Sequence, residues 1–287
     1  MLSFEIFQFA FMQRALITGA AVAIICSVIG LFLVLKRQSL FGDAMSHVAF
    51  GGIALGIFVN IYPLWTAFIV SVLAALGITK LKESTKIPSD SAIAVLLSSG
   101  LALGVVLISL SQGFSLDLFS FLFGSILLVS FQDEITVLAL SIAIISIVCL
   151  LFKKLMYITF SEEQAKVSGL NVLNMNYLFI ILSSITVITS IRLVGVLLIS
   201  SLLVIPNITA MMLGKGFKKT AIISTIIAVF SVEVGIMFSY FGNIAPGGTI
   251  VLFSIIIFLF TILAKFIFKL LSRKNNYKNT IEEHKNK

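Results

Sequence analysis

Residues 15–35 read ALITGAAVAIICSVIGLFLVL, a run without a charged side chain. A helix needs about 20 predominantly apolar residues to cross the hydrocarbon core of a membrane, so this stretch is long enough to span it. Arg14 precedes the run, Glu5 lies upstream, and no small-residue cleavage site follows. The stretch is therefore predicted to be a retained transmembrane helix and not a removable signal peptide.

The composition extends this prediction to the rest of the chain. Of the 287 residues, 59% are hydrophobic and 11% are charged, and the mean hydropathy is +1.16. Such values are typical of integral membrane proteins. Because lipid offers no hydrogen-bond partners to an exposed loop or sheet edge, we expect an all-α, polytopic helical bundle.

Nine apolar segments are expected to cross the membrane, separated by short polar or charged links. They are residues 15–35, 44–60, 62–79, 91–111, 131–152, 176–191, 193–213, 220–241 and 248–268. The second and the sixth are short for a span, so bundles of eight or ten spans also fit the pattern. The transmembrane domain thus covers residues 1–272. The polar tail, residues 273–287, is predicted to be a frayed helix end followed by disorder.

Lysine and arginine residues indicate the orientation of the bundle. Of the 20, all but Arg14 and Arg192 fall in alternate links or in the tail: at 36–37, 80–86, 153–166, 215–219 and from 265 onward. By the positive-inside rule, the N-terminus is expected outside and the C-terminus in the cytoplasm. The net charge of +8 is therefore interpreted as a topology signal, with weak attraction to anionic membrane lipid. It does not require a nucleic-acid partner.

Asp43 and His47 form the first candidate site. They lie four positions apart in FGDAMSHVAF, residues 41–50, so on a helix they share one face with their Cβ atoms about 5–6 Å apart. A carboxylate and an imidazole both suit Mn, Fe and Zn. Two ligands make a weak site, which a second copy related by a two-fold axis would complete. The alternative is structural: Asp43 caps the helix over residues 44–60, and His47 bonds a neighbouring carbonyl.

Two further residues stand out inside apolar segments. Glu233 lies near the middle of the eighth segment, and an acid in a membrane helix is a candidate pathway residue because its burial is costly. Pro206 lacks an amide donor and frees the carbonyl of Leu202, which predicts a kink in the seventh segment. Cys26 and Cys149 have no paired spacing, so neither a disulfide nor a zinc site is expected.

A second candidate site is the link FSEEQAKVSGLNV, residues 160–172. Ser161 and Gln164 have the spacing of a capping box, two acids follow Ser161, and Gly169 is a suitable stop. The pattern predicts a helix of about two turns outside the membrane, over about 161–169, which is too short to be stable alone. It therefore needs a docking surface, on this chain or on a cytoplasmic partner.

The sequence lacks the motifs of an ATPase or a membrane hydrolase. The stretch GKGFKKT, residues 214–220, has the wrong spacing for a P-loop, G-x-x-x-x-G-K-[ST]. On a helix, Ser46 points about 100° away from His47, so the two do not form a nucleophile and base. The chain is expected not to be an enzyme and not to bind ATP through a P-loop.

Five stretches together resemble one family. They are LKRQSLFGDAMSHVAFGGIALG, PSDSAIAVLLSSGLALGVVLIS, SEEQAKVSGLNV, RLVGVLLISSLLVIPNITAMML and FGNIAPGGTIVL, spread over residues 36–252. Their order and content resemble the permease subunits of ATP-binding-cassette importers for manganese, zinc or ferrous iron. One position departs from the family pattern: members often carry a second acid just before Asp90, where this chain has Ser89.

The resemblance implies an assembly in the cell membrane. Two copies of the permease would pair with two cytoplasmic ATP-binding subunits, which use the ATP, and with an extracytoplasmic metal-binding protein. No permanently bound cofactor is implied, and the metal, which the sequence leaves open among Mn, Zn and Fe, is cargo. The family's Asp-x-x-x-His pair falls on Asp43 and His47. Its cytoplasmic coupling helix falls on a stretch whose candidate contacts are Glu162, Glu163, Ala165 and Gly169.

A transporter of another class remains as the alternative. A stand-alone, ion-coupled secondary transporter of divalent cations would also lack an ATP motif, and it would give Glu233 a role that the resemblance does not assign. Such a protein would move its cargo without ATP-binding partners.

Overall fold

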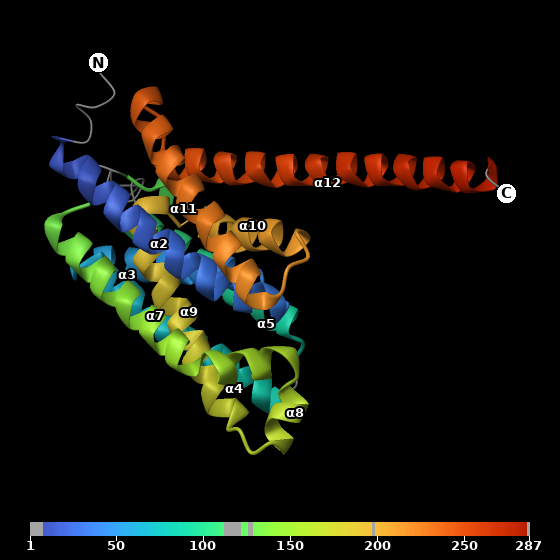
Figure 1. The fold of residues 1–287 in the computed structure, drawn as a ribbon. Coiled ribbons are helices and arrows are strands. Elements are labelled where there is room, and N and C mark those ends of the chain that lie inside the picture. The colour runs from blue at the N-terminus through green and yellow to red at the C-terminus, as the bar shows by residue number, and fades with distance from the viewer. Residues whose placement is uncertain (1–7, 86, 112–121, 126–128, 197–198, 286–287) are drawn as a thin grey trace.

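The computed structural model describes residues 8–85, 87–111, 122–125, 129–196 and 199–285. The regular elements of this part are helices, assembled into one bundle (Figure 1). They are α2 (Ala10–Leu35), α3 (Phe41–Phe58), α4 (Pro63–Thr85), α5 (Ser89–Leu110), α7 (Phe131–Phe160), α8 (Glu162–Val167), α9 (Val172–Val194), α10 (Ile199–Met212), α11 (Phe217–Gly242) and α12 (Pro246–Lys285).

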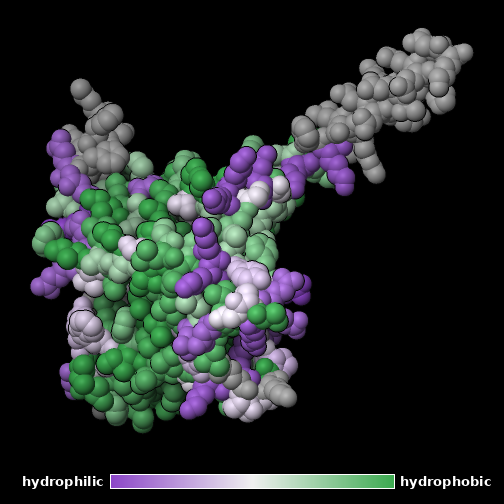
Figure 2. Space-filling view, turned by 60° about the horizontal axis from the view of Figure 1, so that its bottom comes forward, coloured by the Kyte–Doolittle hydropathy of each residue, from purple (hydrophilic) through white to green (hydrophobic). Residues whose placement is uncertain are grey.

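Eight of the described helices are long and apolar enough to cross a membrane: α2, α3, α4, α5, α7, α9, α11 and α12. Broad hydrophobic areas cover the outside of the bundle, as expected for a surface that faces lipid (Figure 2). The prediction of an all-α polytopic protein is confirmed, with a number of spans inside the expected range.

The seventh predicted span is the one that differs. It was expected over residues 193–213, but α9 continues to Val194 and α10 begins only at Ile199. With 14 residues, α10 is about 21 Å long, which is shorter than the hydrocarbon core of about 30 Å. Gly195 explains the break because its φ of 84° is one that residues with a Cβ atom rarely adopt.

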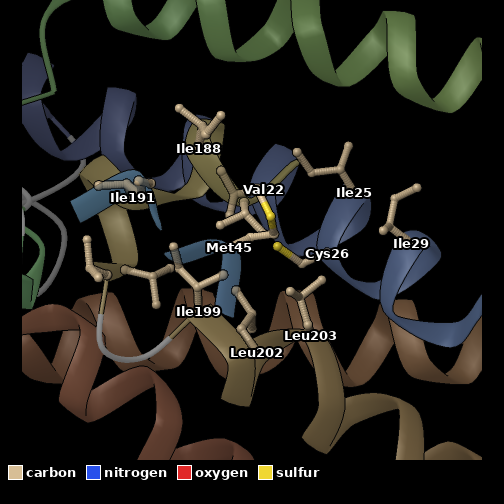
Figure 3. Close-up of a cluster of buried hydrophobic side chains, with 14 of the residues drawn as sticks. Val22, Ile25, Cys26, Ile29, Met45, Ile188, Ile191, Ile199, Leu202 and Leu203 are labelled. Atoms are coloured by element: carbon tan, nitrogen blue, oxygen red, sulfur yellow. The ribbon is translucent and has the colours of Figure 1, made fainter. Parts of the chain in front are cut away.

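Helices α2 and α3 form the centre of the bundle. Within their most apolar windows, 67% and 72% of the residues are buried, against 17% in α12. Helix α2 packs on α7, α9, α10 and α11, and α3 packs on α4, α5, α9 and α10. Figure 3 shows where these helices meet: Cys26 of α2 and Met45 of α3 lie with Ile191 of α9 and Leu202 of α10 in one buried cluster.

Glycines bring α3 unusually close to both of its main neighbours. A Cβ atom on Gly52 would lie 2.6 Å from the Cα atom of Ala67 in α4. On a different side of α3, a Cβ atom on Gly51 would lie 2.9 Å from the carbonyl oxygen of Gly100 in α5. Small residues allow such close approach between membrane helices. The position of α3 is therefore fixed from two sides by backbone contacts.

A buried polar cluster holds the short helix α10. Asn207, next to Pro206, donates to the Leu203 carbonyl at 2.8 Å and accepts from the Ser224 hydroxyl of α11 at 2.6 Å. The Ser27 hydroxyl of α2 donates to Ser224 at 2.9 Å. Because lipid cannot satisfy these groups, the cluster ties α10 to two longer helices.

The polar tail, expected to be a frayed helix end followed by disorder, continues the last helix in the structure, and its disorder stays a prediction. Helix α12 continues without interruption to Lys285 and extends away from the bundle (Figure 1). No glycine or proline occurs between Thr249 and Lys285, and Lys, Arg, Glu and Leu are good helix formers. The sequence therefore contains no signal that would end the helix where the apolar segment ends.

Candidate functional site

Asp43 and His47 lie together near the beginning of α3. The helix starts at Phe41 with Leu40 as its N-cap, and no side chain caps it. Asp43 is therefore the third residue of the helix and not its cap, so the capping alternative is wrong. The Nε2 atom of His47 lies 3.8 Å from Oδ1 of Asp43. The carboxylate also sits in the first helical turn, where the helix dipole favours negative charge.

The backbone around the pair is held by two neighbouring helices. A Cβ atom on Gly100 of α5 would lie 2.8 Å from the carbonyl carbon of His47. A Cβ atom on Gly42 would lie 2.5 Å from a methyl group of Leu203 in α10. Both glycines allow contact at distances that a side chain would prevent. The pair thus sits on a rigid support formed by α3, α5 and α10.

The pair lies on the side of α3 that the other described helices leave partly open. Its side chains are 29% exposed for Asp43 and 16% for His47, whereas the other residues from Phe41 to Ala54 are buried. Leu40, Leu55 and Phe58 are exposed close to the same side of α3. We call these five residues the open stripe of α3. A second protein chain could reach the pair through this stripe.

The pair offers two potential donor groups for a metal ion. Among the described residues, no group of three or more His, Cys, Asp or Glu side chains is close enough to hold a metal ion. Carboxylate and imidazole are donors that suit Mn and Zn, but two donors do not fill a coordination shell. The arrangement can contact a divalent cation without enclosing it.

Glu233 is not brought to this pair by helix packing. It lies in α11, which packs mainly on α2, α10 and α12. Helix α3 packs instead on α4, α5, α9 and α10. The role of Glu233 as a pathway residue stays a prediction, and the helix packing does not connect Glu233 with Asp43 and His47.

The short helix outside the spans is present where the sequence predicts it. Helix α8 covers Glu162–Val167, and the Ser161 hydroxyl accepts the Gln164 N–H at 3.3 Å. Gly169 has a φ of 81°, which explains a glycine at the stop. Ala165 is fully buried, so it anchors α8 on the bundle and does not face outward. The side chain of Val167 is 90% exposed.

A contact that sequence reasoning missed joins α8 to the end of α2. Lys36 donates to the Asn176 side chain at 2.6 Å, and its Nζ atom lies 3.9 Å from Oε1 of Glu162. Asn176 in turn donates to Glu162 at 3.2 Å. The three residues are far apart in the sequence. The available signal was the position of Lys36 directly after an apolar span, which was interpreted only as a sign of orientation.

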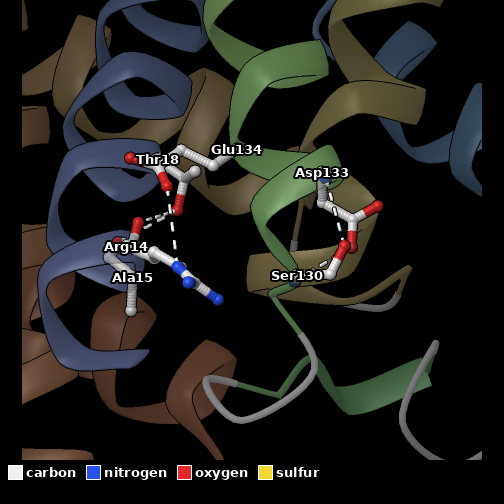
Figure 4. A network of polar contacts seen from close by, with 6 residues as sticks. All are labelled: Arg14, Ala15, Thr18, Ser130, Asp133 and Glu134. Carbon is white, nitrogen blue, oxygen red and sulfur yellow. Dashed lines mark hydrogen bonds and ion pairs between the residues drawn. The ribbon is translucent and has the colours of Figure 1, made fainter. Parts of the chain in front are cut away.

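The opposite end of the bundle has its own polar contacts (Figure 4). Arg14 of α2 pairs with Glu134 of α7 at 3.8 Å, and its guanidinium lies 5.7 Å from the ring centre of Phe131. Ser130 and Asp133 form a complete capping box at the start of α7. In the sequence, Arg14 counted against a signal peptide and was an exception to the charge pattern, and the structure places it in contact with α7.

The fold defines a multi-pass membrane protein that carries a potential metal-ligating pair on its most buried helix. The chain belongs to the ABC 3 transport family, which it matches over residues 8–265. It is therefore a transport component of the cell membrane, a membrane subunit of an ATP-binding-cassette transporter.

Three relatives illustrate the likeness. The manganese import system permease protein ScaB of Streptococcus parasanguinis is 36% identical over 88% of this chain and 90% of its own length. The high-affinity zinc uptake system membrane protein ZnuB of Haemophilus influenzae is 30% identical over 89% and 98%. The structure of PsaBC from Streptococcus pneumoniae in complex with Fab has a TM-score of 0.81 at 34% identity, covering 91% of this chain and 95% of that one.

Proposed function

We propose that this subunit lines the import pathway for a divalent transition metal, with Mn²⁺ as the first candidate and Zn²⁺ as the second, and that Asp43 and His47 contact the ion. The observation that carries the proposal is the position of the pair, 3.8 Å apart on the open stripe of the most buried span. The names of the relatives, manganese for one and zinc for another, support this class of cargo. Fe²⁺ suits the same donors.

A second copy of the chain completes the site. A two-fold axis close to the open stripe would face one Asp43–His47 pair with another and give four donors. A transport site must also release its ion, so a loose site shared between two chains suits the task better than a closed cage. Leu40, Leu55 and Phe58 would supply the apolar part of the same contact, since all three are exposed.

Helix α8 is the docking element for a cytoplasmic ATP-binding subunit, one on each copy. Its exposed side carries Glu163 and Val167, and these residues would enter the partner's groove. Ala165 and Gly169 act differently: the first anchors the helix on the bundle, and the second ends it. ATP is hydrolysed by the partner, and the movement reaches this chain through α8.

The proposal includes an orientation for the two ends of the bundle. Lys36, Lys82 and α8 lie at one end, which would be cytoplasmic by the positive-inside rule, with the N-terminus outside. The end with Arg14 and Glu134 would then face the outside, where an extracytoplasmic protein delivers the metal. The metal is cargo, and no resident cofactor is proposed.

The test measures the Mn, Zn and Fe content of cells that lack the gene, under metal limitation. The cells are complemented with wild type, Asp43→Ala, His47→Ala or the control Ser46→Ala, with membrane expression confirmed. Ser46 lies between the two residues but is fully buried, and its hydroxyl donates to the backbone carbonyl of Asp43 and not to the Asp43 carboxylate. We expect wild type and Ser46→Ala to restore one metal and the other two variants to fail. Full restoration by His47→Ala would refute the ion contact.

The secondary-transporter alternative is tested with the purified chain in vesicles. Uptake of ⁵⁴Mn²⁺ is measured in the presence of the metal-delivering protein, with and without the ATP-binding subunits and ATP. We expect uptake only when both are present. Uptake by the chain alone, driven by an ion gradient, would establish the alternative.

A further inference from the structure

A cavity of about 670 Å³ lies at the end of the bundle that carries α8. It is formed where α2, α4 and α7 end and where α5 and α9 begin. Figure 2 brings this end forward and shows hydrophilic residues gathered beside a broad hydrophobic area. The cavity is outside the metal pair, and the proposed transport mechanism does not use it.

Among the described residues that line the cavity, three side chains are basic and one is acidic. The basic residues are Lys36, Arg37 and Lys82, and the acid is Glu162. Glu162 is half exposed, and its nearest contact to Lys36 is a long 3.9 Å. Its charge therefore compensates the cations only in part. The described lining of the cavity thus carries a surplus of positive charge.

Lys36 is the most buried of the three cations. Its side chain is 9% exposed, and besides Glu162 its recorded partners are neutral: the Asn176 side chain and the face of the Phe179 ring. Burial lowers the pKa of Lys36, the charge of Glu162 opposes this effect, and the charge of Lys82 adds to it. A buried cation without a full counter-charge is costly, so an anion in the cavity would stabilise it.

Arg37 occupies a backbone position that glycine normally takes. It follows the last residues of α2 with a φ of 57°, and the next amide, that of Gln38, bonds back to the Leu33 carbonyl at 2.8 Å. This is the glycine position of a Schellman-type helix end. The arginine adopts the strained conformation and presents its side chain to the cavity. A role for the guanidinium would explain why the strain is tolerated.

Part of the remaining wall is apolar, beside polar side chains such as Ser89 and Asn176. Phe41, Ile78, Ile93 and Ile180 line the same cavity. Lys36 follows the last residue of a membrane span, and Lys82 is the last residue of the apolar part of α4. The cavity thus lies at the boundary between hydrocarbon and water, with basic groups and apolar walls together. Basic pockets between spans on the cytoplasmic side are sites for anionic lipid headgroups.

We infer that this cavity binds the phosphate headgroup of an anionic phospholipid, held by Lys36, Arg37 and Lys82. The phosphate oxygens accept charge-assisted hydrogen bonds from the three cations, and the start of the acyl chains contacts the apolar wall. Lys82 at present donates to the Ser89 hydroxyl at 2.5 Å, a neutral partner that a phosphate would replace.

The test is native mass spectrometry of the full chain released from phosphatidylcholine nanodiscs with and without phosphatidylglycerol. Lys82→Ala and Arg37→Ala are compared with Lys80→Ala, which removes an exposed cation of α4 that does not line the cavity. Each cavity variant is expected to weaken phosphatidylglycerol binding about fivefold. A basic residue near a membrane surface contributes about 1 kcal/mol to lipid binding, which corresponds to this change in affinity. The control should bind as wild type does.

Three results would overturn the inference. One is equal phosphatidylglycerol binding by all variants. In the second, the protein forms no lipid adduct, but inorganic phosphate stabilises it and Lys82→Ala abolishes this stabilisation. This result would assign the cavity to a free anion. In the third, the lipid adduct is lost when the ATP-binding subunit is added, and Lys82 can be cross-linked to that subunit. This result would make the cavity a protein-docking site.

Discussion

Gly100 of α5 lies against the backbone of α3 at Val48, so closely that a Cβ atom on it would be 2.6 Å from the Val48 nitrogen. The neighbouring atom is backbone and cannot rotate away. The helix that carries Asp43 and His47 is therefore positioned by a residue that has no side chain.

Gly100→Ala is expected to lower stability and metal uptake together. The added methyl group would push α3 away from α5 and destabilise the protein by about 1–3 kcal/mol. Thermal unfolding in detergent and metal content of complemented cells measure the two effects. Gly77→Ala is the matched control because nothing lies within 4 Å of a Cβ atom there. If both variants behave alike, close packing at Gly100 does not support the site.

The open stripe of α3 is expected to lie at the contact between two copies. In a background with Cys149→Ser, Leu55→Cys should form a disulfide-linked dimer in membranes under mild oxidation, because two-fold symmetry places equal residues near each other. Leu150→Cys on α7 is the control, since its side chain is 84% exposed but on another helix. Dimers formed through Leu150→Cys and not through Leu55→Cys would place the contact elsewhere.

Charge and shape changes on the exposed side of α8 are expected to release the ATP-binding subunit. Glu163→Lys combined with Val167→Asp should leave the chain folded and inserted, but reduce co-purification of the partner by about tenfold or more. Glu162 is left unchanged because it bonds with Lys36 and Asn176. Lys219→Glu, a charge reversal at an exposed position on the proposed cytoplasmic side, is the control. Undiminished co-purification would exclude α8 as the docking element.

Lys36 should make stability depend on pH in the alkaline range. Its pKa is lowered from 10.5 by burial, so below 10.5 there is a window in which the unfolded chain holds a proton that the folded protein has released. Rising pH favours the folded state across that window, and falling pH removes the gain. Lys36→Met should flatten this rise relative to Lys80→Met in thermal unfolding at a series of pH values. Equal slopes for the two variants would contradict the burial of a charged Lys36.

Much of this architecture follows from apolar length alone. Runs such as residues 15–35 can be interpreted one at a time, because lipid requires each backbone to satisfy its own hydrogen bonds. The break at Gly195 was not predictable in that way. Gly195 lies close to the backbone of Gly124: a Cβ atom on Gly195 would be 2.5 Å from the Gly124 nitrogen. An apolar run contains no information about such a contact.

The candidate site, too, was only partly predictable from the sequence. The spacing of Asp43 and His47 predicts a shared helical face, and the 3.8 Å approach agrees with it. The start of α3 at Phe41 was missed because Phe41 and Gly42 look like the end of a link and not the start of a helix. The contact of Lys36 with Asn176 and Glu162 joins three separate segments, which no local pattern contains.

The shortness of α10 has a consequence for how the protein is made. A segment of 14 residues is too short to partition into the bilayer as an independent unit during synthesis. Its buried amide at Asn207 needs the Ser224 hydroxyl, which belongs to α11 and is translated later. Helix α10 is therefore expected to take its final place in the bundle only after α11 has been synthesised. A chain truncated between α10 and α11 would then leave the amide of Asn207 without this partner.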